Sequence, residues 1–223
     1  VTCLNNAFRL IQLPIGLFGV AVATVTLPHL ARHAALDEKV ALRDRLLVGI
    51  RQTLFLTLPA AIGLFLLAEP IVASIFQYGR FSSESTALTA LALKGYSLGL
   101  VSYACMKVVA PALSAIDRPD IPLRVSLTGI FLNLTFNYIL IRVYNLGILG
   151  LTLTTASVAT LNILQLAWAS HRYVGNLLEP HFLQGVGKIL LCCLALIGAL
   201  LVGGIFIHPL GGPLSVRISG TLI

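Results

Sequence analysis

The sequence predicts an all-α integral membrane protein, a bundle of six transmembrane helices. Of its 223 residues, 57% are hydrophobic and only 10% are charged, and the mean hydropathy is +0.95. Soluble domains do not have this composition. Six apolar segments approach or exceed the roughly 20 residues that cross a bilayer core. The alternating pattern of a membrane β-barrel is absent, and helices are the other structure that satisfies the backbone in lipid.

Each expected helix is centred on one apolar segment. The segments are Leu10–Leu30, Leu46–Ala68, Ala87–Ala115, Val125–Ile141, Leu146–Ala169 and Ile189–Ile207. With their flanking turns, they predict helices at about 6–30, 46–68, 86–115, 122–142, 146–170 and 183–207. The third segment is long enough to tilt, and the fourth is the shortest.

The two ends of the chain suggest a piece of a longer protein. The chain begins without Met and enters an apolar segment almost at once, and residues 216–223 are typical of the start of a further helix. We therefore expect residues 1–223 to form a single transmembrane lobe of a larger molecule.

The charges inside the apolar segments are all positive. Arg51, Lys94 and Lys107 lie within them, whereas all eight acids are expected in the connecting loops. A cation in hydrocarbon is costly and usually faces a protein interior or a water-filled cavity. Cations without acidic partners favour a protein that handles an anion.

The loop charges predict the orientation. Counted in order, the odd-numbered loops carry eight Lys and Arg residues and the even-numbered loops three. The positive-inside rule then places the first loop, residues 31–45, in the cytoplasm. The net charge of +7 is thus an orientation signal, and no pattern of aromatic and basic residues indicates nucleic-acid binding.

The expected depth of each cation in the membrane indicates whether it faces a cavity or reaches the interface. Arg51 lies roughly 7–8 Å, and Lys107 roughly 12 Å, from the cytoplasmic end of its helix, at about 1.5 Å per residue. Arg51 either binds a phosphate or snorkels to the interface, and depth alone leaves both open. Lys107 is harder to explain by snorkelling, so a cavity-facing role is favoured. Lys94 and Arg9 lie near outer ends, where snorkelling is the simpler interpretation.

Other residues indicate bends rather than catalysis. Pro59 and Pro111 lie within apolar segments, where proline kinks a helix, and several kinked helices favour a transporter. No phosphate-binding glycine loop, paired membrane carboxylates, activated nucleophile or metal-ligand spacing occurs, so we expect neither an enzyme nor a cofactor or metal site. The intramembrane amides Asn133, Asn137, Asn162 and Gln165 are expected to form interhelical hydrogen bonds.

Three strings carry a family resemblance. They are FRLIQLPIGLFGVAVATVTLP at Phe8–Pro28, FQYGRF at Phe76–Phe81 and GYSLGLVSYACMKVVAP at Gly95–Pro111, followed by Arg118–Pro119 and Pro122–Arg124. Together they resemble the MurJ/MviN family of bacterial lipid II flippases, within the multidrug/oligosaccharidyl-lipid/polysaccharide exporter superfamily. The resemblance runs from about Asn6 to Tyr173 and weakens to hydrophobicity after about Leu183.

The resemblance implies a fold and a mechanism. Family members have fourteen helices in two lobes, and this chain resembles the eighth to thirteenth, which is most of the C-terminal lobe. The implied activity is flipping of lipid II across the bacterial inner membrane by alternating access. The implied partners are lipid II, membrane lipids and the missing N-terminal lobe.

The resemblance also selects residues. Gly49–Ile50–Arg51, followed by Leu58–Pro59, matches the position of a family cavity arginine, and Lys107 lies in the matching Lys-Val-aliphatic-Ala-Pro string. Arg51 and Lys107 would hold the diphosphate, Arg9 and Lys94 are secondary candidates, and Pro59 and Pro111 are candidate hinges. The family often has an acid where this chain has Phe8, so an acid partner for Arg9 is in doubt.

Three rival interpretations stay open. One is export of another lipid-linked polysaccharide or of drugs, although a drug exporter would be expected to carry a membrane acid. Another is a non-catalytic membrane scaffold or a truncated inactive fragment. The last is a membrane enzyme of the undecaprenyl pathway, which lacks the paired carboxylates that this chemistry needs.

Overall fold

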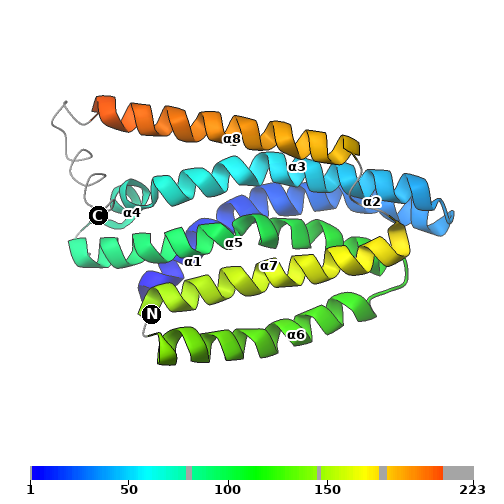
Figure 1. Cartoon of the computed structure of the whole chain (residues 1–223), viewed down its shortest axis with the longest axis horizontal. Coiled ribbons are helices and arrows are strands. Elements are labelled where there is room, and N and C mark those ends of the chain that lie inside the picture. Colours follow the sequence, from blue (N-terminus) through cyan, green and yellow to red (C-terminus); the bar gives the residue numbers. More distant parts are fainter. Residues whose placement is uncertain (1, 79–81, 145–146, 176–179, 208–223) are drawn as a thin grey trace.

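The structure is a computed structural model, which describes residues 2–78, 82–144, 147–175 and 180–207. Within these ranges every regular element is a helix, and the long helices run side by side along the long axis of the molecule (Figure 1). The elements are α1 (Thr2–Pro14), η1 (Ile15–Val20), α2 (Ala21–Ala35), α3 (Lys39–Leu66), α4 (Ala68–Phe76), α5 (Ser83–Ala115), α6 (Asp120–Asn137), η2 (Tyr138–Val143), α7 (Gly147–Val174) and α8 (Pro180–Ile207).

Six helical stretches are long and apolar enough to cross a membrane. They are Thr2–Ala35, Lys39–Leu66, Ser83–Ala115, Asp120–Val143, Gly147–Val174 and Phe182–Leu200. The chain is thus an all-α, multi-pass membrane protein, as the composition predicts. Residues 216–223, where a further helix is expected, lie outside the described residues.

The helices have wider bounds than the apolar segments. The second span begins at Lys39, seven residues before its expected start at 46, because its first turns are charged and continue the helix beyond the apolar run. A short helix, α4, lies at Ala68–Phe76, where a loop is expected from residue 69. Four of the acids, Asp44, Glu69, Glu84 and Asp120, therefore belong to helix ends or short helices and not to loops.

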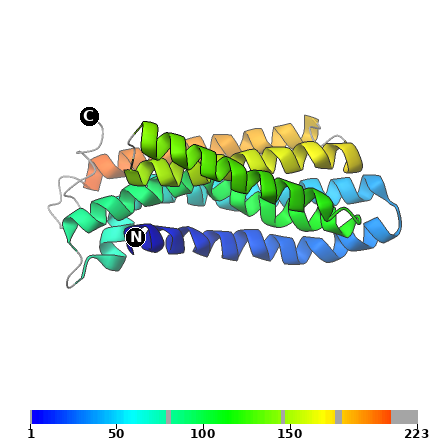
Figure 2. The same cartoon turned by 90° about the horizontal axis from the view of Figure 1, so that it is seen from below.

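Helix α5 is the centre of the bundle. It packs against α7, α3, α1 and α2, and it is buried along much of its length. Helix α8 lies along α3 at one edge, and α6 lies along α7 at the other (Figure 1). Seen after a 90° turn, α1, η1 and α2 follow one another along a single line across the bundle (Figure 2).

Glycines bring α5 and α7 into close contact. A Cβ on Gly99 would lie 2.8 Å from the Cα of Ala156, and one on Gly95 would lie 2.7 Å from the Cβ of Thr152. The pairs Gly95/Gly99 and Thr152/Ala156 are each four residues apart, so they form facing ridges of small residues. Between apolar helices in lipid, such close backbone approach provides the van der Waals packing that drives association.

Several buried threonine hydroxyls donate hydrogen bonds to carbonyl oxygens of their own helix. The Thr53 and Thr57 hydroxyls donate to the carbonyl oxygens of Gly49 (2.9 Å) and Thr53 (2.7 Å), and Thr154 donates to that of Gly150 (2.8 Å). A bond to the carbonyl one turn earlier costs the helix little and leaves none of these three hydroxyls without a partner. Between helices, the Ser102 and Thr160 hydroxyls share a hydrogen bond of 3.1 Å.

The first span contains a wide turn. After Pro14, residues Ile15–Val20 form a π-helical segment, and α2 continues from Ala21. Proline lacks the N–H that a regular helix needs at this position, so the hydrogen-bond pattern is interrupted there. Gly19 lies in this segment against α5: a Cβ on Gly19 would lie 3.2 Å from the Cα of Ala104.

We predict that Gly99→Ala destabilises the bundle. The added methyl would meet the α7 backbone at 2.8 Å, and overpacking of this kind costs about 1–3 kcal/mol. The unfolding midpoint in detergent, followed by circular dichroism, should fall. Gly63→Ala in α3 is the matched control, since nothing lies within 4 Å of its added Cβ and alanine favours a helix by up to about 1 kcal/mol. Equal midpoints for the two variants would contradict the close α5–α7 contact.

Candidate functional site

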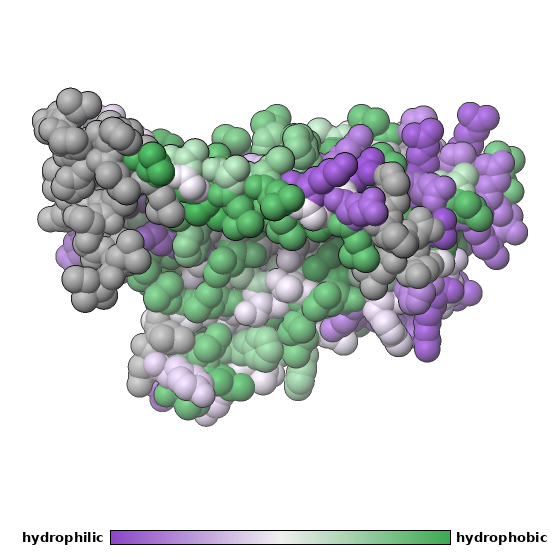
Figure 3. All heavy atoms as spheres, turned by 45° about the horizontal axis from the view of Figure 1, so that its top comes forward, coloured by the Kyte–Doolittle hydropathy of each residue, from purple (hydrophilic) through white to green (hydrophobic). Residues whose placement is uncertain are grey.

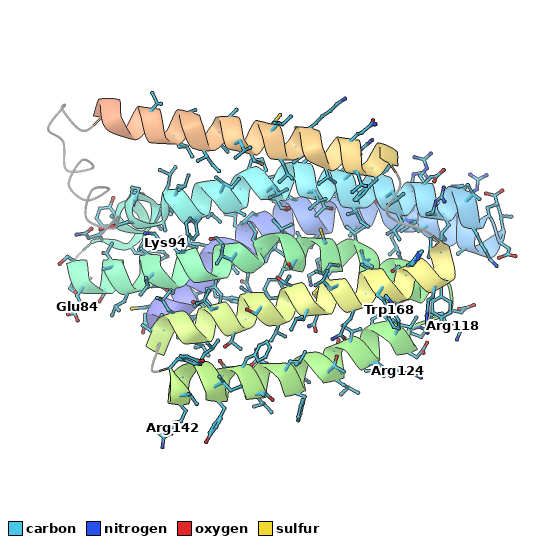
Figure 4. The ribbon with its side chains drawn as sticks, in the orientation of Figure 1. Glu84, Lys94, Arg118, Arg124, Arg142 and Trp168 are labelled. Atoms are coloured by element: carbon cyan, nitrogen blue, oxygen red, sulfur yellow. The ribbon has the colours of Figure 1, made fainter. Side chains whose placement is uncertain are left out.

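Most charges gather at one end of the bundle, and many are paired there. This basic end carries the α2–α3 and α5–α6 connections and the end of α7. Its ion pairs include Arg43 with Asp44 (3.1 Å) and Arg124 with Asp120 (3.6 Å). The Arg118 guanidinium stacks on Tyr173 and that of Arg172 on Trp168, at 4.9 and 4.5 Å from the ring centroids. Figure 4 places Arg118, Arg124 and Trp168 at this end and Glu84 and Arg142 at the opposite one.

Arg51 lies in a groove between α3 and α8. The groove encloses about 330 Å³ and is lined by Arg51, Gln52, Phe55, Gln184, Gly185, Lys188 and Ile189. Two cations and two amides thus share a space whose other walls are apolar. On the side of the molecule that carries α8, a hydrophilic patch interrupts the apolar surface inward of the basic end (Figure 3).

The packing of α3 explains why Arg51 faces α8. Gly49 meets the core: a Cβ there would lie 3.1 Å from Thr26 of α2 and 3.2 Å from Val108 of α5. Arg51 follows two residues later, about 200° around the helix, so its side chain leaves on the opposite face. There it crosses Gly185 of α8, whose added Cβ would lie only 2.9 Å from the Arg51 Cδ.

The two groove cations have no acidic partner in the described part of the chain. The ion pairs found there join His33, Lys39, Arg43 and Arg124 to nearby acids, and neither Arg51 nor Lys188 takes part in one. Arginine offers a planar fork of donors and lysine a mobile point charge, a combination that suits phosphate oxygens. Chemically, this groove can bind an anion.

Lys188 is the groove cation that is absent from the candidates predicted from the sequence. The helix expected at 183–207 contains Lys188, but the residue lies just before the apolar segment, which begins at Ile189, and so is counted with the preceding loop. In the structure it belongs to α8, which begins at Pro180. The spacing of Gln184, Lys188 and the intervening glycines on one face was the available signal, but no feature of the sequence says that this face meets Arg51.

Lys107 does not line the Arg51 groove. It is exposed on α5, while its neighbours Val108 and Val109 are buried in the core. Because Val108 contacts Gly49, Lys107 and Arg51 lie at a similar level of the bundle, yet they emerge on different faces. Arg51 and Lys107, which the resemblance implies would hold the diphosphate together, therefore do not share this groove.

The secondary candidates are dispersed. Arg9 is exposed on α1, and Lys94 is half-buried on α5 near the end where α4 lies (Figure 4). Pro59 and Pro111 lie inside α3 and α5, each of which is assigned as one unbroken helix. The π-helical segments lie elsewhere: η1 directly follows Pro14, and η2 follows α6.

One of the intramembrane amides, Gln165, forms a hydrogen bond between α6 and α7, whereas others do not. The Thr128 hydroxyl donates to the Gln165 Oε1 (2.9 Å) between the two helices, and the Asn137 Nδ2 donates to the Asn133 Oδ1 (2.8 Å) within α6. The Oδ1 atoms of Asn137 and Asn162 are buried without a partner. Among the described residues no group of three or more His, Cys, Asp or Glu side chains could hold a metal ion.

Comparison with known proteins gives a consistent set of relatives. The chain is 34% identical over 157 residues to a probable lipid II flippase MurJ of Buchnera aphidicola and 35% identical over 169 residues to the lipid II flippase MurJ of Burkholderia cenocepacia. These alignments cover 70% and 74% of the chain but only 31% and 32% of the relatives. The chain thus spans about a third of the length of the curated relatives it matches.

The fold is also that of a solved flippase. The chain superimposes on the lipid II flippase MurJ in its inward closed conformation with a TM-score of 0.65 and 25% identity, covering 94% of this chain and 48% of that one. The family model described as lipid II flippase MurJ matches residues 1–217, nearly the whole sequence. With its six membrane-crossing helices and its matching fold, the chain belongs to the lipid II flippase MurJ family.

Proposed function

We propose that this chain is the C-terminal-lobe part of a flippase that moves lipid II across the bacterial inner membrane. The observation that carries the proposal is the family match over residues 1–217, and the Arg51 groove supplies a chemistry that fits it. Lipid II carries a diphosphate, and a guanidinium without an acidic partner is suited to bind one. The function is transport and not catalysis.

The mechanism that we propose is alternating access. The lobe formed by this chain moves against the missing N-terminal lobe, and the headgroup passes between them while the isoprenoid tail stays in lipid. Arg51 binds the diphosphate through its fork of N–H donors. Lys107, exposed at a similar level on another face, holds the same group at a different stage of the movement or adds to its attraction.

Arg9 and Lys94 would have a lesser part, holding lipid headgroups at the outer end. Pro59 and Pro111 would be the hinges of α3 and α5, since each leaves a carbonyl oxygen of the preceding turn without its usual N–H partner. A helix weakened at one turn bends there at the lowest cost.

We further propose that residues 31–45 face the cytoplasm. The basic end of the bundle supports this orientation, because Lys and Arg are enriched in the cytoplasmic loops of membrane proteins. Lys39, Arg43, Arg45 and Lys188 belong to α3 and α8 in the structure, but the rule counts cations near the ends of the spans as well as those in the loops.

Replacement of Arg51 tests the function. In the full-length protein, Arg51→Ala should fail to support growth of a bacterium depleted of its own flippase, at unchanged expression. Loss of hydrogen bonds to a charged group costs about 1.5–3 kcal/mol, or roughly ten- to a hundredfold in binding. Arg51→Lys should restore growth in part, since it keeps the charge and loses the fork.

Arg124→Ala is the matched control. Arg124 is exposed and pairs with Asp120 one turn away, an interaction worth under about 1 kcal/mol. This variant should grow normally. Normal growth of Arg51→Ala as well would remove Arg51 from the mechanism.

Cysteine labelling tests the orientation. In a background that lacks the four native cysteines, Val40→Cys at the basic end should react with an impermeant maleimide only in inside-out vesicles. Ser83→Cys, at the opposite end, should react only in intact spheroplasts. Both positions are exposed, so the substitutions should be tolerated. The reverse labelling pattern would invert the proposed topology.

A further inference from the structure

We propose that α8 contributes half of a two-helix site for the diphosphate of an isoprenoid lipid. In this site Lys188 and Gln184 of α8 act together with Arg51 and Gln52 of α3. The inference rests on the proposed function and extends it, because the strings that carry the resemblance all lie before α8 and gave this helix no part in binding.

The geometry brings four polar side chains to one groove. Gln184 and Lys188 are one helical turn apart on α8, and both line the groove with Arg51 and Gln52. The space of about 330 Å³ in this open groove exceeds what a single water molecule needs and is at the lower end of ligand pockets. Side chains with three kinds of donor group therefore line a volume suited to a small headgroup.

The charge of the groove favours a diphosphate. Arg51 and Lys188 are both cationic, and neither forms an ion pair within the described residues. Two like charges that share one space repel each other, and an anion placed between them removes that cost. A diphosphate offers two phosphoryl groups, one for each cation, whereas the phosphodiester of an ordinary phospholipid offers one.

The surroundings favour a lipid over a soluble anion. The groove lies between the apolar stretches Lys39–Leu66 and Phe182–Leu200, both of membrane-crossing length. Phe55 and Ile189 complete its lining, and Phe55 is 57% exposed beside the polar groups. A ligand with a charged head and an apolar chain matches both parts, while inorganic pyrophosphate matches only the first.

Gly185 leaves the space that the Arg51 side chain occupies. An added Cβ at residue 185 would come within 2.9 Å of the Arg51 Cδ and 3.6 Å of its Nη1. The absence of a side chain at residue 185 therefore leaves room for the arginine against α8, in the groove that Gln184 and Lys188 also line. A larger residue at 185 would displace the arginine without changing any charge.

Direct binding tests the site. The full-length protein is placed in phosphatidylcholine nanodiscs, and its affinity for farnesyl diphosphate is measured. Arg51→Gln and Lys188→Gln should each weaken binding by about tenfold. Gly185→Val should weaken it as well, although it keeps both cations. Lys39→Gln, at an exposed position beside Asp37, is the control and should leave the affinity unchanged.

The outcomes separate the site from the function. If Lys188→Gln and Gly185→Val bind as the wild type while Arg51→Gln is weakened, α8 is no part of the site, and the proposed function stands on the growth assay alone. If inorganic pyrophosphate or phosphatidylglycerol competes as well as farnesyl diphosphate, the site is not built for an isoprenoid diphosphate. Lys188→Arg should bind like the wild type, which excludes misfolding at this position as the cause of the loss.

Discussion

The close approach of α5 and α7 is the contact on which the rest of the bundle depends. Apolar helices in lipid gain nothing from burying apolar surface as such, so they associate through close packing and hydrogen bonds. Gly95 and Gly99 let the α5 backbone reach Thr152 and Ala156 of α7. With this pair fixed, the remaining faces of α5 become the surface on which α1, α2 and α3 pack.

The position of the groove follows from the same packing. Gly49 fits α3 against Thr26 and Val108, which fixes the face of α3 that meets the core. The opposite face, with Arg51, is then turned outward, where α8 covers it. The cation is half-buried between two helices, shielded from bulk water yet reachable from the groove.

Hydropathy was sufficient to predict the number of spans and the helical class, because lipid imposes both length and secondary structure. It did not predict where helices end: Lys39–Arg45 are charged but still helical, and α4 is too short to register as a span. The end of α3 at Lys39 also lies further from Arg51 than the apolar run indicated. The faces on which Arg51 and Lys107 emerge could not be predicted, because they are set by partners such as Gly49 and Gly185 that are far apart in the sequence.

The wide turn at Ile15–Val20 has a consequence for the phase of the first span. Its buried residues before the turn are Ala7, Ile11 and Pro14, and those after it are Gly19, Thr26 and Leu30. In an uninterrupted helix of about 3.6 residues per turn the second set would fall roughly 100° away from the first, one residue late. A π turn takes up one extra residue and brings both sets back to the same side. The span thus contains one residue more than a regular α-helix of the same length. If the π turn moved along the helix, the residues that it passed would rotate about the helix axis, while the two ends of the span would stay in place.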